Sequence, residues 1–133
     1  MERLNNPHVT EYTVGPDLID HYGHVNYRNY PLIYDYGQDD LMASRGWPFS
    51  RIENELGLKV VVRDLHLNYP GQIVEGEQIL ILTEMELGRT SLKFRQQLEK
   101  RGEIINEQDL ITVFLGAEGK VAIPEIVRRD LES

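Results

Sequence analysis

The order of two side-chain patterns restricts the fold of this chain most: a helix-type spacing comes early, and strand-type spacing follows it. Large side chains recur at helical intervals between Tyr30 and Leu41, and Pro31 falls in the first turn, where its missing N–H costs nothing. Gly46 and Pro48 end the pattern. The sequence therefore predicts a helix that begins after Asn29 and is roughly 20 Å long.

The two sides of this helix differ in polarity. The side expected to be buried carries Tyr30, Ile33, Tyr34, Gly37 and Leu41. The side expected to face solvent carries Asp35, Gln38 and Asp39. A shorter helical segment is expected at Phe49 to Leu56, because Gly57 stops it. The tail from Ile123 to Val127 is expected to continue as a short helix.

Strand patterns occupy the rest of the chain. The predicted strands are His8 to Val14, Lys59 to Tyr69, Gln78 to Leu87, Thr90 to Lys100 and Ile105 to Leu115. In the strand Lys59 to Tyr69, one face carries Leu65, Leu67 and Tyr69, and the other carries Asp64, His66 and Asn68. In the strand Thr90 to Lys100, the residues expected to face inward are Leu92, Phe94 and Leu98, and those expected to face out are Lys93, Arg95 and Gln97. The apolar run from Leu110 to Leu115 is typical of a central strand. We expect one α+β domain over residues 1–133, with an antiparallel sheet wrapped around one long central helix.

Composition narrows the possible partners. Hydrophobic residues make up 41% of the 133 residues, and the formal net charge is −8, which disfavours a primary nucleic-acid role but permits a small anionic ligand. There is no cysteine, so disulfides, thiolate catalysis and cysteine-based zinc sites are excluded. No apolar run approaches the roughly 20 residues that span a bilayer. Without a signal-peptide pattern at the N-terminus, the chain is expected to be cytoplasmic.

The densest group of polar chemistry lies just before the predicted helix. Asp20, His21, His24 and Asn26 fall within seven residues, next to an aromatic-rich segment. A helix N-terminus presents unpaired backbone N–H groups that can stabilise developing negative charge. This segment is therefore the candidate catalytic site.

The same segment resembles a known family. The run Asp20-x-x-Gly23-His24-Val25-Asn26, followed by Asn29-Tyr30, resembles the hot-dog-fold acyl-CoA thioesterases of the 4-hydroxybenzoyl-CoA type. Its Asp-x-x-x-His-Val-Asn core is also similar to the plant acyl-carrier-protein thioesterases, which share that fold. The Gly88-Arg89-Thr90-Ser91 corner and the Ile123-Pro124 tail agree with the resemblance. The resemblance implies a hot-dog fold that hydrolyses acyl-CoA thioesters to a free carboxylic acid and CoA.

The resemblance also implies roles for individual residues. Asp20 is expected to act as nucleophile or general base, and the amide of Tyr27 is expected to hold the oxyanion. His24 and Asn26 are expected to orient the substrate, position water or share in acid–base work. Tyr30 and Tyr34 line the acyl pocket or fill the core. Residues expected to contact the phosphates of coenzyme A are Arg89, Ser91, Lys93 and Arg95.

Each of these interpretations has an alternative. The alternative for Asp20 is an N-cap or turn aspartate, with Asp17 or Asp35 as the catalytic carboxylate. The alternative for Asn26 is that it shapes the loop by pairing with the backbone. The basic residues are equally explained as a solvated strand face. A metal site at His21 and His24 is weakly indicated, so no metal or other cofactor is expected. Two other functions remain open, an acyl-CoA-binding sensor without catalysis and a hot-dog hydratase or dehydratase.

The partners follow from the same reasoning. We expect a small-molecule acyl-CoA substrate, no nucleic acid and no membrane. One sheet of this size leaves strand edges exposed, and a partner usually covers such edges. The family pattern is a homodimer with two sites at the interface, often paired into a tetramer. The sequence does not identify the acyl group, and it does not separate CoA from carrier-protein thioesters.

Overall fold

The computed structural model describes residues 1–133. Its elements are β1 (His8–Thr13), the 3-10 turns η1 (Pro16–Leu18) and η2 (Tyr27–Asn29), α1 (Tyr30–Ser44), α2 (Phe49–Leu56), β2 (Lys59–Asn68), β3 (Gln78–Leu87), β4 (Ser91–Lys100), β5 (Glu103–Gly116), β6 (Gly119–Lys120) and α3 (Glu125–Leu131). The predicted helices and strands are confirmed, with small shifts at their ends. The two 3-10 turns and the short β6 are additional.

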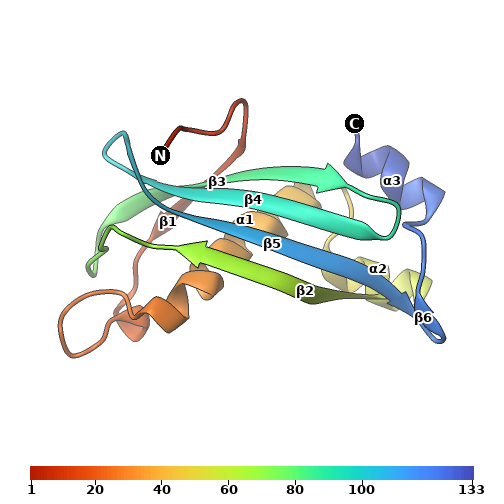
Figure 1. Ribbon diagram of the computed structural model, residues 1–133, viewed down its shortest axis with the longest axis horizontal. Coiled ribbons are helices and arrows are strands. Elements are labelled where there is room, and N and C mark those ends of the chain that lie inside the picture. The colour runs from red at the N-terminus through yellow and green to blue at the C-terminus, as the bar shows by residue number, and fades with distance from the viewer.

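The sheet is antiparallel throughout, and its strand order is β1-β3-β4-β5-β2, with β6 paired to β5. The curved sheet covers α1, which lies behind it in Figure 1, while α2 and α3 lie together at one end. The loop that contains Asp20 lies at the other end, next to η2 and the start of α1. We call the end with this loop the cleft end and the end with α2 and α3 the distal end. None of the helices combines the length and apolar composition that crossing a bilayer requires.

Close packing of α1 on the sheet depends on Gly37. A Cβ atom at this position would lie 2.6 Å from both Ile81 Cγ2 and Thr83 Oγ1. Gly46, with φ of +85°, lets the chain turn immediately after the helix, which is a conformation that glycine adopts without strain. The predicted buried side of the helix is confirmed, since Tyr30, Ile33 and Tyr34 are almost fully buried.

Gln38 corrects the expectation of a solvent-facing position. Its side chain is only 5% exposed, and Nε2 donates to Gln96 Oε1 at 2.9 Å. Gln96 Nε2 in turn donates to the Tyr34 carbonyl and to Thr83 Oγ1. The amide finds buried hydrogen-bond partners on the sheet, and this compensates for its removal from water. We call Gln38, Thr83, Gln96 and Gln108 the polar layer.

The polar layer separates two apolar clusters. The site cluster, at the cleft end, consists of Val14, Leu18, Val25, Tyr30, Ile33, Tyr34, Ile73, Ile79, Ile81 and Leu98. The distal cluster consists of Leu41, Met42, Trp47, Ile52, Leu92, Phe94, Leu110, Phe114, Ile123, Val127 and Leu131. The elements α1, β3, β4 and β5 each pass from one cluster to the other at their member of the polar layer, as α1 does at Gln38. The interior is therefore built as two halves.

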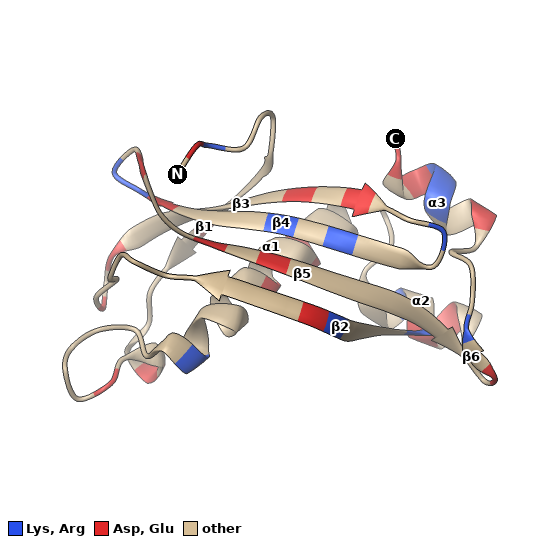
Figure 2. Cartoon of the chain, in the orientation of Figure 1, with Lys and Arg blue, Asp and Glu red and all other residues tan.

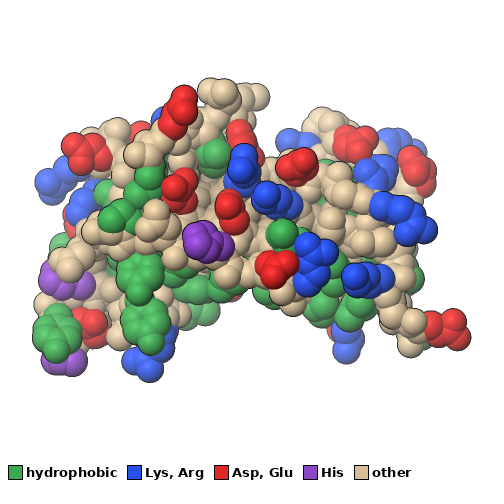
Figure 3. Space-filling view, viewed as in Figure 1, with side chains coloured by type: hydrophobic (Ala, Val, Ile, Leu, Met, Phe, Trp, Pro, Cys, Tyr) green, Lys and Arg blue, Asp and Glu red, His purple; other side chains and the backbone are tan.

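The face of the sheet away from α1 carries charges of both signs (Figures 2 and 3). Glu84, Arg95, Asp109 and His66 occupy one cross-strand row on β3, β4, β5 and β2. Arg95 and Asp109 approach to 3.9 Å, and both are about half exposed. Gln97 lies on this outward face, as predicted, but it is buried because it hydrogen-bonds the backbone of the N-terminal segment at Glu2 and Leu4.

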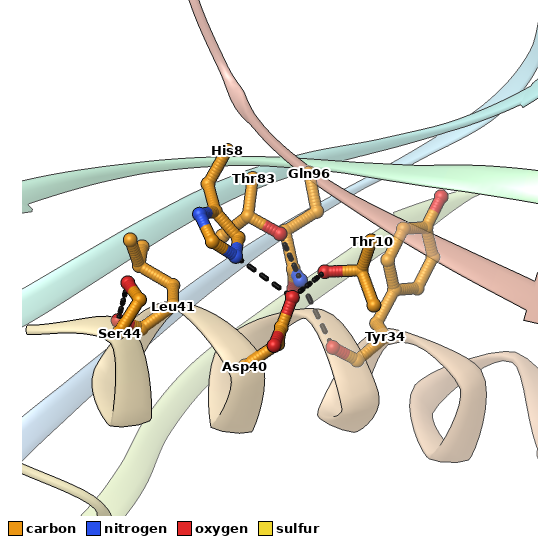
Figure 4. A network of polar contacts seen from close by, with 8 residues as sticks. All are labelled: His8, Thr10, Tyr34, Asp40, Leu41, Ser44, Thr83 and Gln96. Carbon is orange, nitrogen blue, oxygen red and sulfur yellow. Dashed lines mark hydrogen bonds and ion pairs between the residues drawn. The ribbon is translucent and has the colours of Figure 1, made fainter.

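A polar contact fastens the edge strand β1 to α1 (Figure 4). Asp40 Oδ2 accepts hydrogen bonds from Thr10 Oγ1 at 2.7 Å and is 2.8 Å from His8 Nε2. Hydrogen bonds from Thr10 and then from His8 are the main causes that lower the pKa of Asp40 below its usual value. The helix is thus tied to the sheet edge by a carboxylate that is favoured in its charged form.

Candidate active site

Asp20 lies in a tight loop whose shape is set by backbone pairing. The amide of Asp20 donates to the His24 carbonyl at 2.9 Å, and isolated bridges join Ile19 to Val25 and His24 to Val74. Gly23 has φ of +85°, so it supplies the left-handed residue that closes the turn. Asp20 is therefore presented from a fixed loop, directly in front of η2 and α1.

One carboxylate oxygen of Asp20 accepts a hydrogen bond from the chain, and the other oxygen does not. Oδ1 accepts a hydrogen bond from the Tyr22 amide at 2.9 Å, which is the turn contact given above as the alternative for this residue. Oδ2 has no hydrogen-bond or ion-pair partner in the chain. The two interpretations are compatible, because the turn contact orients the carboxylate and leaves one oxygen for chemistry.

A cleft of about 370 Å³ opens beside this carboxylate. It is lined by Asp20, Tyr22, His24, Val25, Tyr27, Tyr30, Tyr69, Pro70, Gly71 and Gln72. Asp20 is the one carboxylate among them, and tyrosines contribute most of the aromatic surface. The rings of Tyr27 and Tyr69 are nearly parallel, at 12°, with their centroids 6.1 Å apart. The structure thus brings Asp20, His24, Tyr27 and Tyr30 to one concave site.

The backbone N–H of Tyr27 is free for a ligand. Tyr27 is the first residue of η2, and its N–H makes no hydrogen bond within the chain. The next two amides are occupied, since Arg28 N donates to Asn26 Oδ1 and Asn29 N donates to the Asn26 carbonyl. An unpaired N–H at the start of a helical segment is a favourable donor to negative charge. Its residue lines the same cleft as Asp20.

Asn26 shapes the loop and does not line the cleft. Its Oδ1 accepts hydrogen bonds from Arg28 N at 3.0 Å and from Arg28 Nε at 3.1 Å. These contacts correspond to the loop-shaping interpretation of Asn26. Asn26 therefore reaches the site only through the position it imposes on its neighbours Tyr27 and Arg28.

The two tyrosines of the predicted acyl pocket lie in different places. Tyr30 borders the cleft, and its hydroxyl donates to the Gly71 carbonyl at 3.4 Å. Burial raises the pKa of Tyr30 to about 12, so its hydroxyl stays protonated at neutral pH. Tyr34 lies one turn further into the core, where its hydroxyl donates to Asn106 Oδ1, and burial raises its pKa well above the usual value. Tyr34 does not line the cleft of this chain.

The predicted phosphate-binding residues lie far from this cleft within one chain. Arg89 is in the β3–β4 turn at the distal end, where its carbonyl accepts a hydrogen bond from the Ile123 amide. Ser91 and Lys93 follow at the start of β4, paired with Val113 and Ile111. Asp20 lies at the opposite end of the sheet, so the structure does not bring these residues to it.

The alternative site residues have other surroundings. Asp17 does not line the cleft, and Asp35 lies on the exposed side of α1, where partial burial and then the Asp39 charge raise its pKa. His21 and His24 do not form with Asp20 a group that could hold a metal ion. The sequence reasoning missed Tyr22, Tyr69, Gly71 and Gln72 as cleft residues. The alternation that sets Tyr69 on the same face as Leu67 was the one available signal.

Comparison with known proteins supports the fold. No protein-family model and no curated protein matches the sequence. A hypothetical protein from Thermus thermophilus is 26% identical, covers 93% of this chain and 96% of its own, and superposes with a TM-score of 0.87. A 1,4-dihydroxy-2-naphthoyl-CoA thioesterase from Synechocystis is 10% identical, with coverage of 94% and 95% and a TM-score of 0.86.

A third solved structure carries coenzyme A. It is a hypothetical protein from Staphylococcus aureus in complex with CoA, 18% identical, with coverage of 99% of this chain and 85% of its own and a TM-score of 0.85. The similarities extend over nearly the whole chain, although the sequences have diverged widely. The antiparallel sheet curled around α1 is therefore the hot-dog fold, the fold of solved acyl-CoA thioesterases.

Proposed function

We propose that this protein hydrolyses acyl-CoA thioesters to a free carboxylic acid and CoA. The observation that carries the proposal is that Asp20 and Tyr27 line one cleft, and that Asp20 Oδ2 and the Tyr27 N–H have no hydrogen-bond partner in the chain. The named thioesterase and the CoA complex among the similar structures support the choice of a CoA thioester. We propose a subfamily of the 4-hydroxybenzoyl-CoA type, because the Asp20 loop carries its pattern.

The chemistry follows one of two routes. In the first, Asp20 Oδ2 attacks the thioester carbonyl carbon, the C–S bond breaks, CoA leaves as its thiolate, and water hydrolyses the resulting anhydride. In the second, Asp20 takes a proton from a water molecule that attacks the carbonyl directly. In both routes the carbonyl oxygen becomes negative, and the Tyr27 N–H donates a hydrogen bond to it. Neither route requires a metal or another cofactor, since the thioester is already activated.

His24 is the neighbouring group with suitable acid–base chemistry. His24 lines the same cleft as Asp20, and we propose that its imidazole orients water or returns a proton to the leaving sulfur. Tyr30 contributes a neutral hydroxyl and an apolar ring surface to the same cleft. We assign Asn26 the positioning of the loop. These roles rest on the cleft geometry and on the resemblance of the loop.

A second copy of the chain is proposed as partner. β2 is an edge strand with β5 as its only neighbour, and it exposes Val62 and Leu65. Antiparallel pairing of two β2 edges buries these side chains and satisfies the free strand edge. Tyr69 directly follows β2 and lines the cleft, so the cleft borders the proposed interface. Two such dimers can assemble further into a tetramer.

This dimer gives the distal basic residues a role. β2 runs from the distal end at Lys59 to the cleft end at Asn68, so antiparallel pairing sets the distal end of one copy beside the cleft of the other. Arg89, Ser91 and Lys93 of the second copy are then available to the CoA phosphates. The predicted site would thus be assembled from two chains. A cytoplasmic location and the absence of nucleic-acid partners stay predictions.

The test is a panel of acyl-CoA substrates assayed by release of free thiol, with wild type and Asp20→Asn. Asparagine keeps the Oδ1 acceptor for the Tyr22 amide, so the loop conformation should persist. We expect a loss of at least about a hundredfold in kcat, about 3 kcal/mol of transition-state stabilisation. Asp17→Asn is the matched control and should retain wild-type turnover.

Other outcomes identify the alternatives. Near-normal turnover in Asp20→Asn would move the catalytic carboxylate to another residue. Tight binding of CoA esters without thiol release would favour an acyl-CoA sensor. Hydration of a double bond in an enoyl-CoA, without thiol release, would favour a hydratase.

A further inference from the structure

Arg28 is the one basic residue in an otherwise acidic stretch. No other Lys or Arg lies between Arg3 and Arg45. The acidic residues in the same stretch are Glu11, Asp17, Asp20, Asp35, Asp39 and Asp40. Arg28 nevertheless forms no ion pair with any of them. A cation that is left unpaired among so many carboxylates requires an explanation.

Arg28 is hydrogen-bonded through its backbone N and its side-chain Nε, and its two Nη groups are free. Asn26 Oδ1 accepts hydrogen bonds from both the backbone N and the side-chain Nε of Arg28. The guanidinium carbon lies 5.9 Å from the centroid of the Tyr27 ring, a cation–π distance. The two Nη groups have no partner in the chain and Arg28 is exposed. The guanidinium is therefore preorganised to offer two parallel donors to a planar anion.

Its position relates it to the reacting carbonyl. Arg28 directly follows Tyr27, which lines the cleft and has an unpaired backbone N–H, and adjacent Cα atoms are about 3.8 Å apart. The charged groups lining the cleft itself are limited to Asp20, besides the His24 imidazole. An anionic ligand therefore meets Asp20 and a chain of net charge −8, and Arg28, which adjoins the cleft residue Tyr27 in the chain, is a cation without an ion-pair partner.

We propose that Arg28 binds an anionic oxygen group of the substrate at the cleft mouth, which makes it a specificity-determining residue. The inference rests on the proposed thioesterase function and names its substrate class. Two parts of an acyl-CoA carry such a group, a carboxylate on the acyl chain or a phosphate of CoA. The phosphates are separated from the sulfur by the whole pantetheine arm, whereas Arg28 lies one residue from the oxyanion donor. We therefore assign the acyl carboxylate, so the preferred substrates are monothioesters of dicarboxylic acids.

The test compares four thioesters that separate the two sources. Glutaryl and valeryl groups differ in one terminal carboxylate, and each is attached to CoA or to pantetheine, which lacks the phosphates. Wild type, Arg28→Gln and Arg28→Lys are assayed by thiol release. Arg129→Gln is the control, because Arg129 is an exposed arginine on α3 that pairs with the neighbouring Asp130 and is not assigned to the proposed site.

In Arg28→Gln we expect KM for both glutaryl thioesters to rise at least about tenfold, with kcat and both valeryl thioesters unchanged. Arg28→Lys should restore only part of the loss, because lysine keeps the charge without the planar fork. A rise in KM confined to the two CoA thioesters would overturn the assignment of the acyl carboxylate and would make a phosphate of CoA the anion that Arg28 binds. An equal change for all four thioesters, or no change for any, would overturn the proposal.

Binding measurements keep this inference distinct from the proposed function. S-carboxybutyl-CoA and S-pentyl-CoA are thioethers that cannot be hydrolysed, and their binding to wild type and Arg28→Gln is followed by calorimetry. Weaker binding of the carboxylated thioether alone supports the role of Arg28 even if no thioester is turned over. Turnover with identical binding by the two proteins would retain the hydrolase and remove the role of Arg28.

Discussion

The two halves of the interior use the same architecture for different purposes. In both, α1 packs against the inner face of the sheet, but the site cluster contains two tyrosines with hydroxyls that need partners. The distal cluster contains Trp47, Phe94 and Phe114 and is closed by α2 and α3 (Figure 1). The site cluster with its tyrosines borders the open cleft, whereas α2 and α3 cover the distal cluster. We infer that the distal half mainly supplies stability, which lets the site half keep polar groups and an opening.

The first and largest test of this division removes a ring from the distal cluster. Phe114 is fully buried, so Phe114→Ala should lower the free energy of unfolding by about 3–5 kcal/mol. Because Phe114 is buried and is none of the residues assigned to the cleft or to CoA binding, kcat and KM of the folded variant should stay within about twofold of wild type. Urea unfolding and thiol-release kinetics at a temperature where the variant is folded measure both quantities. A large loss of kcat in the folded variant would show that the halves are coupled.

The second test breaks the boundary between the halves. Gln96→Leu leaves Gln38 Nε2 without its acceptor and Thr83 Oγ1 without its donor inside the core. A buried group left unpaired costs roughly 1–3 kcal/mol, so the unfolding free energy should fall by at least that amount. Adding Gln38→Leu removes one of the stranded groups, and the double variant should be more stable than the sum of the single changes implies. Strict additivity would show that the pair does not interact.

The smallest expected effect concerns the contact between β1 and α1 (Figure 4). The pKa of Asp40 is lowered in the folded protein, so its contribution to stability is present above the unfolded pKa near 4 and is lost as pH falls through the lower folded value. The side chain is about half exposed, which limits the contribution to about 1 kcal/mol or less. The stability difference between wild type and Asp40→Asn should therefore shrink between pH 7 and pH 3. A difference that grows on acidification would contradict the assigned role.

The elements were predictable because their patterns are local. Helical spacing after Asn29 identified α1, and alternation identified the inner side of β2 and β4, including Leu67 and Phe94. Gln38 was misplaced because a polar residue in a helix is normally solvated, and its buried partner Gln96 lies 58 positions further along the chain. The polar layer depends on such distant pairs, so no local sequence pattern predicts it.

The candidate site was predictable only in part for the same reason. The loop segment identified Asp20, His24 and Tyr27, which the structure places on one cleft. The opposite wall, with Tyr69 and Gly71, comes from the end of β2 and becomes part of the site only when β2 pairs with β5. Asn26 carried the family pattern, yet its observed contacts are with its own neighbours. A motif reports residue types, whereas the wall of a cleft depends on strand pairing.

The sheet register also has a consequence for how the chain is made. His8 in β1 pairs with Thr83, and Lys59 in β2 pairs with Leu115, so the two outer strands must wait for partners that leave the ribosome much later. Until then the apolar side of α1 has no sheet to cover it. Nearly complete synthesis is needed before the fold can close, and we expect the nascent chain to depend on protection from chaperones during that interval.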